Sequence, residues 1–116
     1  SPALFVGASN RMSIAQDEIF GPVATVVPFS SDEEALALAN DSAYGLAASV
    51  WTRDLNKAHK FVRELEAGVV WVNCFGDGDM TQPFGGFKQS GNGREWGVEG
   101  IHEFLETKSV FGFATA

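Results

Sequence analysis

The chain has 116 residues, of which 45% are apolar, so it can form one compact domain with a hydrophobic core. Fifteen acidic and eight basic residues give a net charge of −7, which disfavours binding to nucleic-acid phosphates and to anionic membrane surfaces. Cys74 is the single cysteine, and no apolar run approaches the ~20 residues of a membrane-spanning helix, so we expect a soluble cytoplasmic protein.

The first half of the chain predicts a strand, a helix and a second strand. Residues 23–29 (VATVVPF) are largely apolar and β-branched, which is typical of a short strand buried on both faces. Ser31 stands three residues before Glu34, the spacing of a capping box, and predicts a helix that ends near Asn40. Residues 47–51 predict the second strand.

The second half repeats this alternation. Apolar residues at spacings of three and four predict a helix from about Asp54 to Gly68, followed by a buried strand over residues 69–72. A loop over residues 75–93, a helix over 94–106 and a strand over 107–114 complete the chain. This order predicts an α/β fold, a partial parallel sheet with flanking helices. Three strands buried on both faces need more sheet than 116 residues supply, so we expect the chain to be part of a larger unit.

The segment PFGGFKQSGNGRE, residues 83–95, holds four glycines and raises the question of a phosphate-binding loop. Residues 91–97 exceed the G-x-G-x-x-G spacing by one residue and follow a loop instead of a strand. The neighbouring DGDMT, residues 77–81, lacks the glycine and glutamate that a calcium-binding EF-hand places at its sixth and twelfth positions. Both patterns are therefore interpreted as turns, and a loop of this length indicates a functional or contact surface.

Cys74 paired with His59 or His102 would be a thiol nucleophile with its base. The sequence offers no third group to orient such a pair, and a free cysteine at the end of an apolar strand usually packs as a small hydrophobic residue. No catalytic residue is assigned.

Two aromatic positions leave a binding role open. If residues 18–20 are extended, Glu18 and Phe20 point to the same side, where a carboxylate accepts from both hydroxyls of a ribose and a ring packs beside a flat base. The spacing alone favours the other interpretation, a surface glutamate before a buried phenylalanine at a Gly-Pro turn. Phe84, between Pro83 and two glycines, can line a pocket or pack in a core.

Five motifs in order across about ninety residues resemble the carboxy-terminal part of the NAD(P)-dependent aldehyde dehydrogenase superfamily. The resemblance covers essentially the whole chain. The motifs are EIFGP at 18–22, ND at 40–41 with YGLAA at 44–48, AG at 67–68 with VN at 72–73, PFGGFKQSG at 83–91, and GRE at 93–95.

The resemblance implies a role for individual residues. Glu18 corresponds to the glutamate that holds the nicotinamide ribose, and Phe20 to the phenylalanine beside the nicotinamide. Phe84 corresponds to an aromatic residue of the aldehyde tunnel. Backbone carbonyls at Lys88 and Gly91 correspond to positions that help hold a monovalent cation between subunits in some relatives.

The same resemblance implies which parts of the family's chemistry lie elsewhere. The nucleophilic cysteine in its Gly-Gln-x-Cys context and the general-base glutamate have no counterpart here, and Cys74 lies in a different segment. Residues 1–106 are expected to be part of the catalytic domain, and residues 107–116 the strand that pairs with a neighbouring subunit.

The expected function is therefore a carboxy-terminal segment of an enzyme that oxidises aldehydes to carboxylic acids. It would supply nicotinamide-ribose contacts, tunnel wall and subunit contacts, and be inactive alone. NAD or NADP and an aldehyde would bind to the parent enzyme, a homo-oligomer, and the isolated chain would bind no cofactor; nucleic acid and membranes are not expected partners. The alternative is a stand-alone, non-catalytic remnant that self-associates or docks on a full-length relative.

Overall fold

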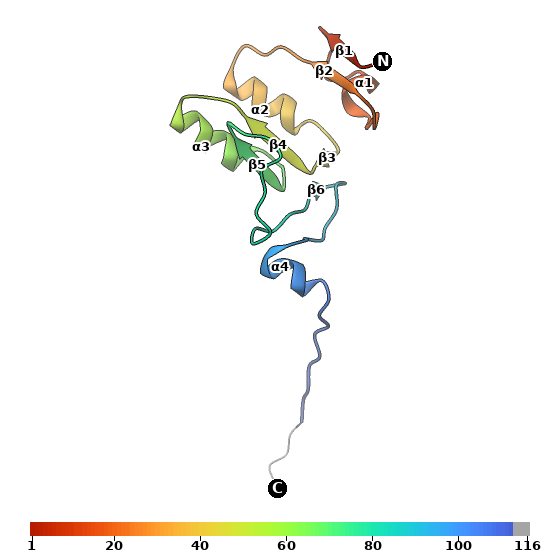
Figure 1. Ribbon diagram of the computed structural model, residues 1–116, viewed down its shortest axis with the longest axis vertical. Helices are drawn as coiled ribbons and strands as arrows, with labels where there is room; N and C mark the ends of the chain where they lie inside the picture. Colours follow the sequence, from red (N-terminus) through yellow and green to blue (C-terminus); the bar gives the residue numbers. More distant parts are fainter. Residues whose placement is uncertain (113–116) are drawn as a thin grey trace.

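The computed structural model describes residues 1–112, which form an α/β arrangement built on three separate strand pairs (Figure 1). β1 and β2 are parallel, with Ala3 opposite Val23, and β4 and β5 are parallel, with Ala47 opposite Val69. β3 and β6 form a short antiparallel pair. The strands are β1 (Ala3–Val6), β2 (Val23–Val26), β3 (Tyr44–Gly45), β4 (Ala47–Val50), β5 (Val69–Val72) and β6 (Phe87–Lys88); the helices are α1 (Ser13–Gln16), α2 (Asp32–Asn40), α3 (Leu55–Glu64) and α4 (Gly97–His102).

The two long helices begin where the sequence predicts. The Ser31 side chain accepts a hydrogen bond from the amide of Glu34 at 3.1 Å, and Asp54 caps α3 by accepting from the two amides of residues 56 and 57. The Glu34 carboxylate accepts from the hydroxyl and amide of Ser30, which lowers the pKa of this carboxyl below its usual value. These local bonds fix the start of each helix without help from the rest of the fold.

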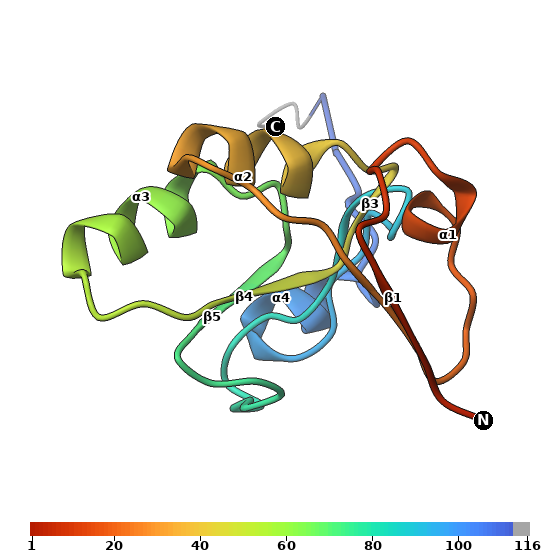
Figure 2. The ribbon, with the colours of Figure 1, turned by 90° about the horizontal axis from the view of Figure 1, so that it is seen from above.

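Ion pairs hold α2 and α3 side by side on one side of β4 and β5 (Figure 2). Lys57 lies 2.8 Å from Asp32, and Lys60 lies 2.5 Å from Glu33. The hydrogen bond to Glu33 raises the pKa of Lys60, and the same contact lowers the pKa of Glu33. The small core lies between these elements, where Leu36, Val50 and Ala58 are buried.

Several predicted boundaries are wrong. α3 ends at Glu64, four residues before Gly68, and α4 spans six residues where the sequence predicted a helix over 94–106. Residues 107–112 belong to no strand within the single chain and lead away from the body of the molecule (Figure 1), while residues 113–116 lie outside the described residues. β1 and α1 were not predicted, because neither segment carries an apolar period long enough to stand out.

Gly68 is required by close packing and not by a helix end. A Cβ atom there would lie 1.7 Å from the Gly85 carbonyl oxygen and 2.8 Å from its carbonyl carbon. The glycine therefore lets the start of β5 lie directly against the glycine-rich segment. This close contact joins the start of β5 to residues 83–95.

The molecule exposes much more surface than a compact protein of its size. Its accessible surface is 9137 Å². A compact monomer of 12.4 kDa exposes roughly 6,100 Å². The radius of gyration is 19.4 Å, against about 13 Å for a compact domain of this length. Strands predicted to be buried on both faces are partly bare, with Val26 44% and Val72 37% exposed.

Replacing Gly68 with alanine should destabilise the fold, because the added methyl group collides with backbone atoms that have no freedom to move aside. The expected loss is about 3 kcal/mol in the free energy of unfolding, measured by urea denaturation followed by tryptophan fluorescence. Gly21→Ala is the matched control, since a Cβ at Gly21 meets no atom within 4 Å. Equal urea midpoints for the two variants would contradict the close-packing account.

Candidate functional site

The glycine-rich segment folds into a closed ring. Phe84 and Glu95 exchange backbone hydrogen bonds of 2.8 and 2.7 Å, which join the two ends of the segment. Inside the ring, the Arg94 guanidinium donates through Nη1 to the carbonyls of Gly86 and Gly93, at 2.9 and 2.8 Å, and lies 5.6 Å above the Phe87 ring. The Arg94 side chain thus binds two carbonyl groups of its own loop.

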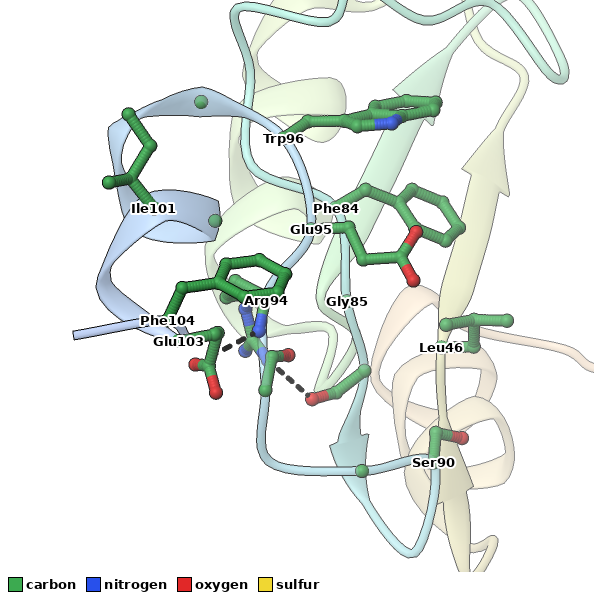
Figure 3. Close-up of a pocket in the computed structure, with 15 residues that line it drawn as sticks. Leu46, Phe84, Gly85, Ser90, Arg94, Glu95, Trp96, Ile101, Glu103 and Phe104 are labelled. Carbon is green, nitrogen blue, oxygen red and sulfur yellow. Dashed lines mark hydrogen bonds between the residues drawn. The ribbon is translucent and has the colours of Figure 1, made fainter. Parts of the chain in front are cut away.

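Phe84 forms a wall between two cavities. One, of about 900 Å³, lies between the ring and α4 and is lined by Phe84, Arg94, Trp96 and Phe104 among others (Figure 3). The other, of about 580 Å³, lies on the side of β5 and is lined by Phe84 and Trp96 together with Trp71 and Asp77. The rings of Phe84 and Trp96 pack with their centres 5.4 Å apart. Phe84 therefore both packs and lines a pocket, the two possibilities left open by the sequence.

Trp96 is the residue of this wall that sequence reasoning missed. It precedes α4 with a left-handed backbone, φ of 61°, a conformation that a bulky side chain rarely adopts. Its position next to Gly97 is the signal that was available, since two successive residues with positive φ mark a sharp change of chain direction. The turn places the indole over Phe84, as Figure 3 shows.

Glu18 and Phe20 lie in the exposed segment between α1 and β2. The premise of an extended stretch is wrong at Phe20, whose φ is 54°, so strand alternation does not relate the two side chains. Phe20 is 93% exposed and its ring is free for a partner. Glu18 lines a cavity of about 500 Å³ with Ser42, Tyr44 and Ser90 among others, and Ser90 also lines the large cavity beside Phe84. The structure therefore links the two predicted contact regions through the glycine-rich segment.

The Lys88 and Gly91 backbone forms a tight turn. Both residues have positive φ, 53° and 123°, and the Gly91 amide donates to the Lys88 carbonyl at 3.4 Å. Within residues 1–112, no group of three His, Cys, Asp or Glu side chains is placed to hold a metal ion. A cation held by backbone carbonyls is a different kind of site and stays a prediction.

Cys74 and the acidic loop behave as structural elements. The Ser49 hydroxyl donates to the Cys74 carbonyl at 2.7 Å, which ties the end of β5 to β4. Asp79 accepts from the amide of Thr81 at 2.9 Å, and this bond lowers the pKa of the Asp79 carboxyl. The turn interpretation of residues 77–81 agrees with this bond. In residues 1–112, no helix has both the length and the apolar character needed to cross a bilayer.

Comparison with known proteins gives one consistent result. The family model described as the aldehyde dehydrogenase family matches residues 1–110. NADP/NAD-dependent aldehyde dehydrogenase PuuC of Escherichia coli (strain K12) is 54% identical over 110 residues, which are 95% of this chain and 22% of that protein. 2-Aminomuconic semialdehyde dehydrogenase of Danio rerio is 47% identical over 109 residues, with 94% and 22% covered.

Solved structures agree with the sequence comparison. The indole-3-acetaldehyde dehydrogenase AldA of P. syringae, determined with NAD+ and IAA, superimposes with a TM-score of 0.88 at 56% identity, covering 92% of this chain and 22% of that one. The aldehyde dehydrogenase KauB of Pseudomonas aeruginosa gives a TM-score of 0.88 at 54% identity, covering 90% and 21%. The chain thus spans about a fifth of the length of these relatives.

Proposed function

The chain belongs to the aldehyde dehydrogenase family, and on this premise we propose that it is the carboxy-terminal segment of an NAD(P)-dependent aldehyde dehydrogenase. The observation that carries the proposal is the match of residues 1–110, at 54% identity, to a stretch that makes up only 22% of a relative. The parent enzyme oxidises an aldehyde to a carboxylic acid. The segment contributes contacts to that reaction and not its nucleophile.

Glu18 and Phe20 are the proposed nicotinamide-ribose contacts. The bound cofactor would accept the hydride from the aldehyde carbon. The exposed carboxylate of Glu18 accepts from a ribose diol, and the bare ring of Phe20 offers a face to a planar heterocycle. The fit is supported by the cavity beside Glu18, whose lining includes the hydroxyl residues Ser42 and Tyr44.

Phe84 is the proposed wall of the aldehyde tunnel. The Phe84 phenyl group lies between two cavities and packs against the Trp96 indole. The Phe84 backbone is held by its hydrogen bonds to Glu95, which close the loop of residues 84–95. An aromatic side chain fixed in this way excludes water from a reacting aldehyde and limits the shape of the group attached to it. The backbone carbonyls of Lys88 and Gly91 are the proposed ligands of a monovalent cation at a subunit contact.

Residues 107–116 are the proposed strand for a subunit contact in a homo-oligomer. The described part of this segment, 107–112, has no partner strand among residues 1–112, and Phe111 is 91% exposed. Residues 1–106 would be covered by the remainder of the catalytic domain, since Phe20, Phe75 and Phe104 are each at least 80% exposed. The chain as a whole exposes roughly 3,000 Å² more than a compact monomer, an excess to which these residues contribute. The same excess is the observation that favours the alternative, a remnant that self-associates.

Changing Glu18 to Gln in the full-length polypeptide should weaken the binding of NAD(P)+ about tenfold, because a hydrogen bond to a carboxylate contributes more than one to a neutral amide. The dissociation constant is measured by isothermal titration calorimetry. Glu64→Gln is the matched control, since it neutralises an exposed carboxylate on α3 that does not line the cavity beside Glu18, and it should leave the constant unchanged. If both variants weakened cofactor binding equally, the effect would come from the overall negative charge of the protein, and the assigned contact between Glu18 and the ribose would be contradicted.

The 116-residue chain alone should form no NADH or NADPH from any aldehyde, because it lacks the thiol nucleophile and the base of the family. Absorbance at the wavelength of the reduced cofactor is followed with a panel of aliphatic and aromatic aldehydes, with a full-length relative as the positive control. Turnover by the purified chain would overturn the assignment of catalysis to residues outside this segment.

A further inference from the structure

The C-terminal end of α2 collects hydrogen-bond donors from a distant segment near the start of the chain. A helix leaves its last carbonyl groups without partners inside the helix. Here Asn10 donates through Nδ2 to the carbonyls of Leu38 and Asp41, at 3.3 and 3.2 Å, and Gln16 donates through Nε2 to the carbonyl of Asp41 at 2.8 Å. These bonds fasten the segment that ends at Glu18 to the end of α2.

Lys88 brings the glycine-rich segment to the same place. Its ammonium donates to the carbonyls of Asn40 and Ser42, at 2.7 and 3.2 Å, and pairs with the Glu66 carboxylate at 2.6 Å. A cation is stabilised at a helix C-terminus, where the helix dipole is negative. The side chain is only 24% exposed, so the contact is sheltered from bulk solvent.

We propose that Lys88 is a positioning residue that fixes the loop bearing Phe84 relative to the segment bearing Glu18 and Phe20. Both loops are fastened to consecutive carbonyls at the end of α2, one through Lys88 and the other through Asn10 and Gln16. The inference rests on the proposed function, in which the first loop lines the aldehyde tunnel and the second holds the nicotinamide. Lys88 therefore sets how the aldehyde carbon faces its hydride acceptor, and this role belongs to its side chain, apart from any cation held by its carbonyl.

The chain allows this contact to be removed without unfolding the loop. β6 stays paired with β3 through its ladder, the Gln89 amide donates to the Ala43 carbonyl at 3.0 Å, and the Gly45 amide donates to the Ser90 hydroxyl at 3.0 Å. Lys88→Met keeps the length and the apolar stem of the side chain and the backbone carbonyl, and removes only the ammonium. Lys88→Arg keeps the charge.

The experiment uses the full-length polypeptide that carries this segment. Lys60→Met is the matched control, because it removes an ion pair with Glu33 at the opposite end of α2. Lys88→Met should slow the first turnover of cofactor reduction about tenfold and increase its isotope effect with a C1-deuterated aldehyde, since small misplacements of reacting atoms are costly. The dissociation constant for the cofactor should change little, and Lys88→Arg should restore most of the rate.

Hydrogen exchange on the same proteins separates this inference from the proposed function. Lys88→Met should speed amide exchange at residues 40–46 and 10–18, on both sides of the α2 end, and Lys60→Met should not. Unchanged exchange there, or equal slowing of turnover by Lys88→Met and Lys60→Met, would overturn the positioning role. If the wild type oxidises no aldehyde, the proposed function fails, and the exchange comparison alone decides whether Lys88 couples the two loops.

Discussion

The arrangement of the molecule depends on the carbonyl groups at the end of α2. Among residues 1–112, the pair β1–β2 shares no ladder with the other two strand pairs, so backbone pairing alone does not fix its position relative to them. Asn40 itself extends the junction, because its side chain donates to the Glu64 carbonyl at 2.8 Å and accepts from the Glu66 amide at 2.9 Å. Together with Asn10, Gln16 and Lys88, it connects α3, the first segment and the glycine-rich segment at one place.

A second constraint is the surface that the chain leaves uncovered. Phe20, Phe75, Phe104 and Phe111 are each at least 80% exposed, and the described residues bury few large apolar side chains. Apolar surface of this extent is characteristic of an interface with other protein and not of a free monomer. In the relatives, the stretch that matches this chain is about a fifth of the total length. If the chain is a segment of a larger catalytic domain, as proposed, the exposed apolar surface is the part that the rest of that domain covers.

Local signals in the sequence predicted part of the fold well. Ser31 and Asp54 cap their helices through bonds within four residues, and Val69–Val72 is a strand because its own β-branched residues favour one. Gly68 was interpreted as a helix end, whereas it allows close packing against Gly85. A sequence alone does not distinguish these two roles of glycine. The left-handed backbone of Phe20 and Trp96, and the reach of Lys88 to α2, arise from tertiary contacts that no local pattern encodes.

In the candidate site, too, some features were predicted from the sequence and others depend on tertiary contacts. Spacing alone favoured a surface role for Glu18 and a buried one for Phe20, and it left Phe84 undecided. The family resemblance assigned their roles in binding. The structure then added the contacts, with Phe84 in the wall between two cavities and Ser90 lining both the cavity beside Glu18 and the larger one. The roles of Trp96 and of the Lys88 side chain depend on the folded structure, because Trp96 has an unusual backbone angle and Lys88 contacts residues distant in the sequence.

The central claim is that this sequence is one segment of a longer dehydrogenase. The intact mass of the polypeptide produced from its gene in the native source tests that claim most directly. The account predicts a mass several times the 12.4 kDa of this chain, in a polypeptide that carries the nucleophilic cysteine ahead of these residues. A mass near 12.4 kDa would contradict it, and the exposed surface would then have to be covered by self-association or by a separate protein.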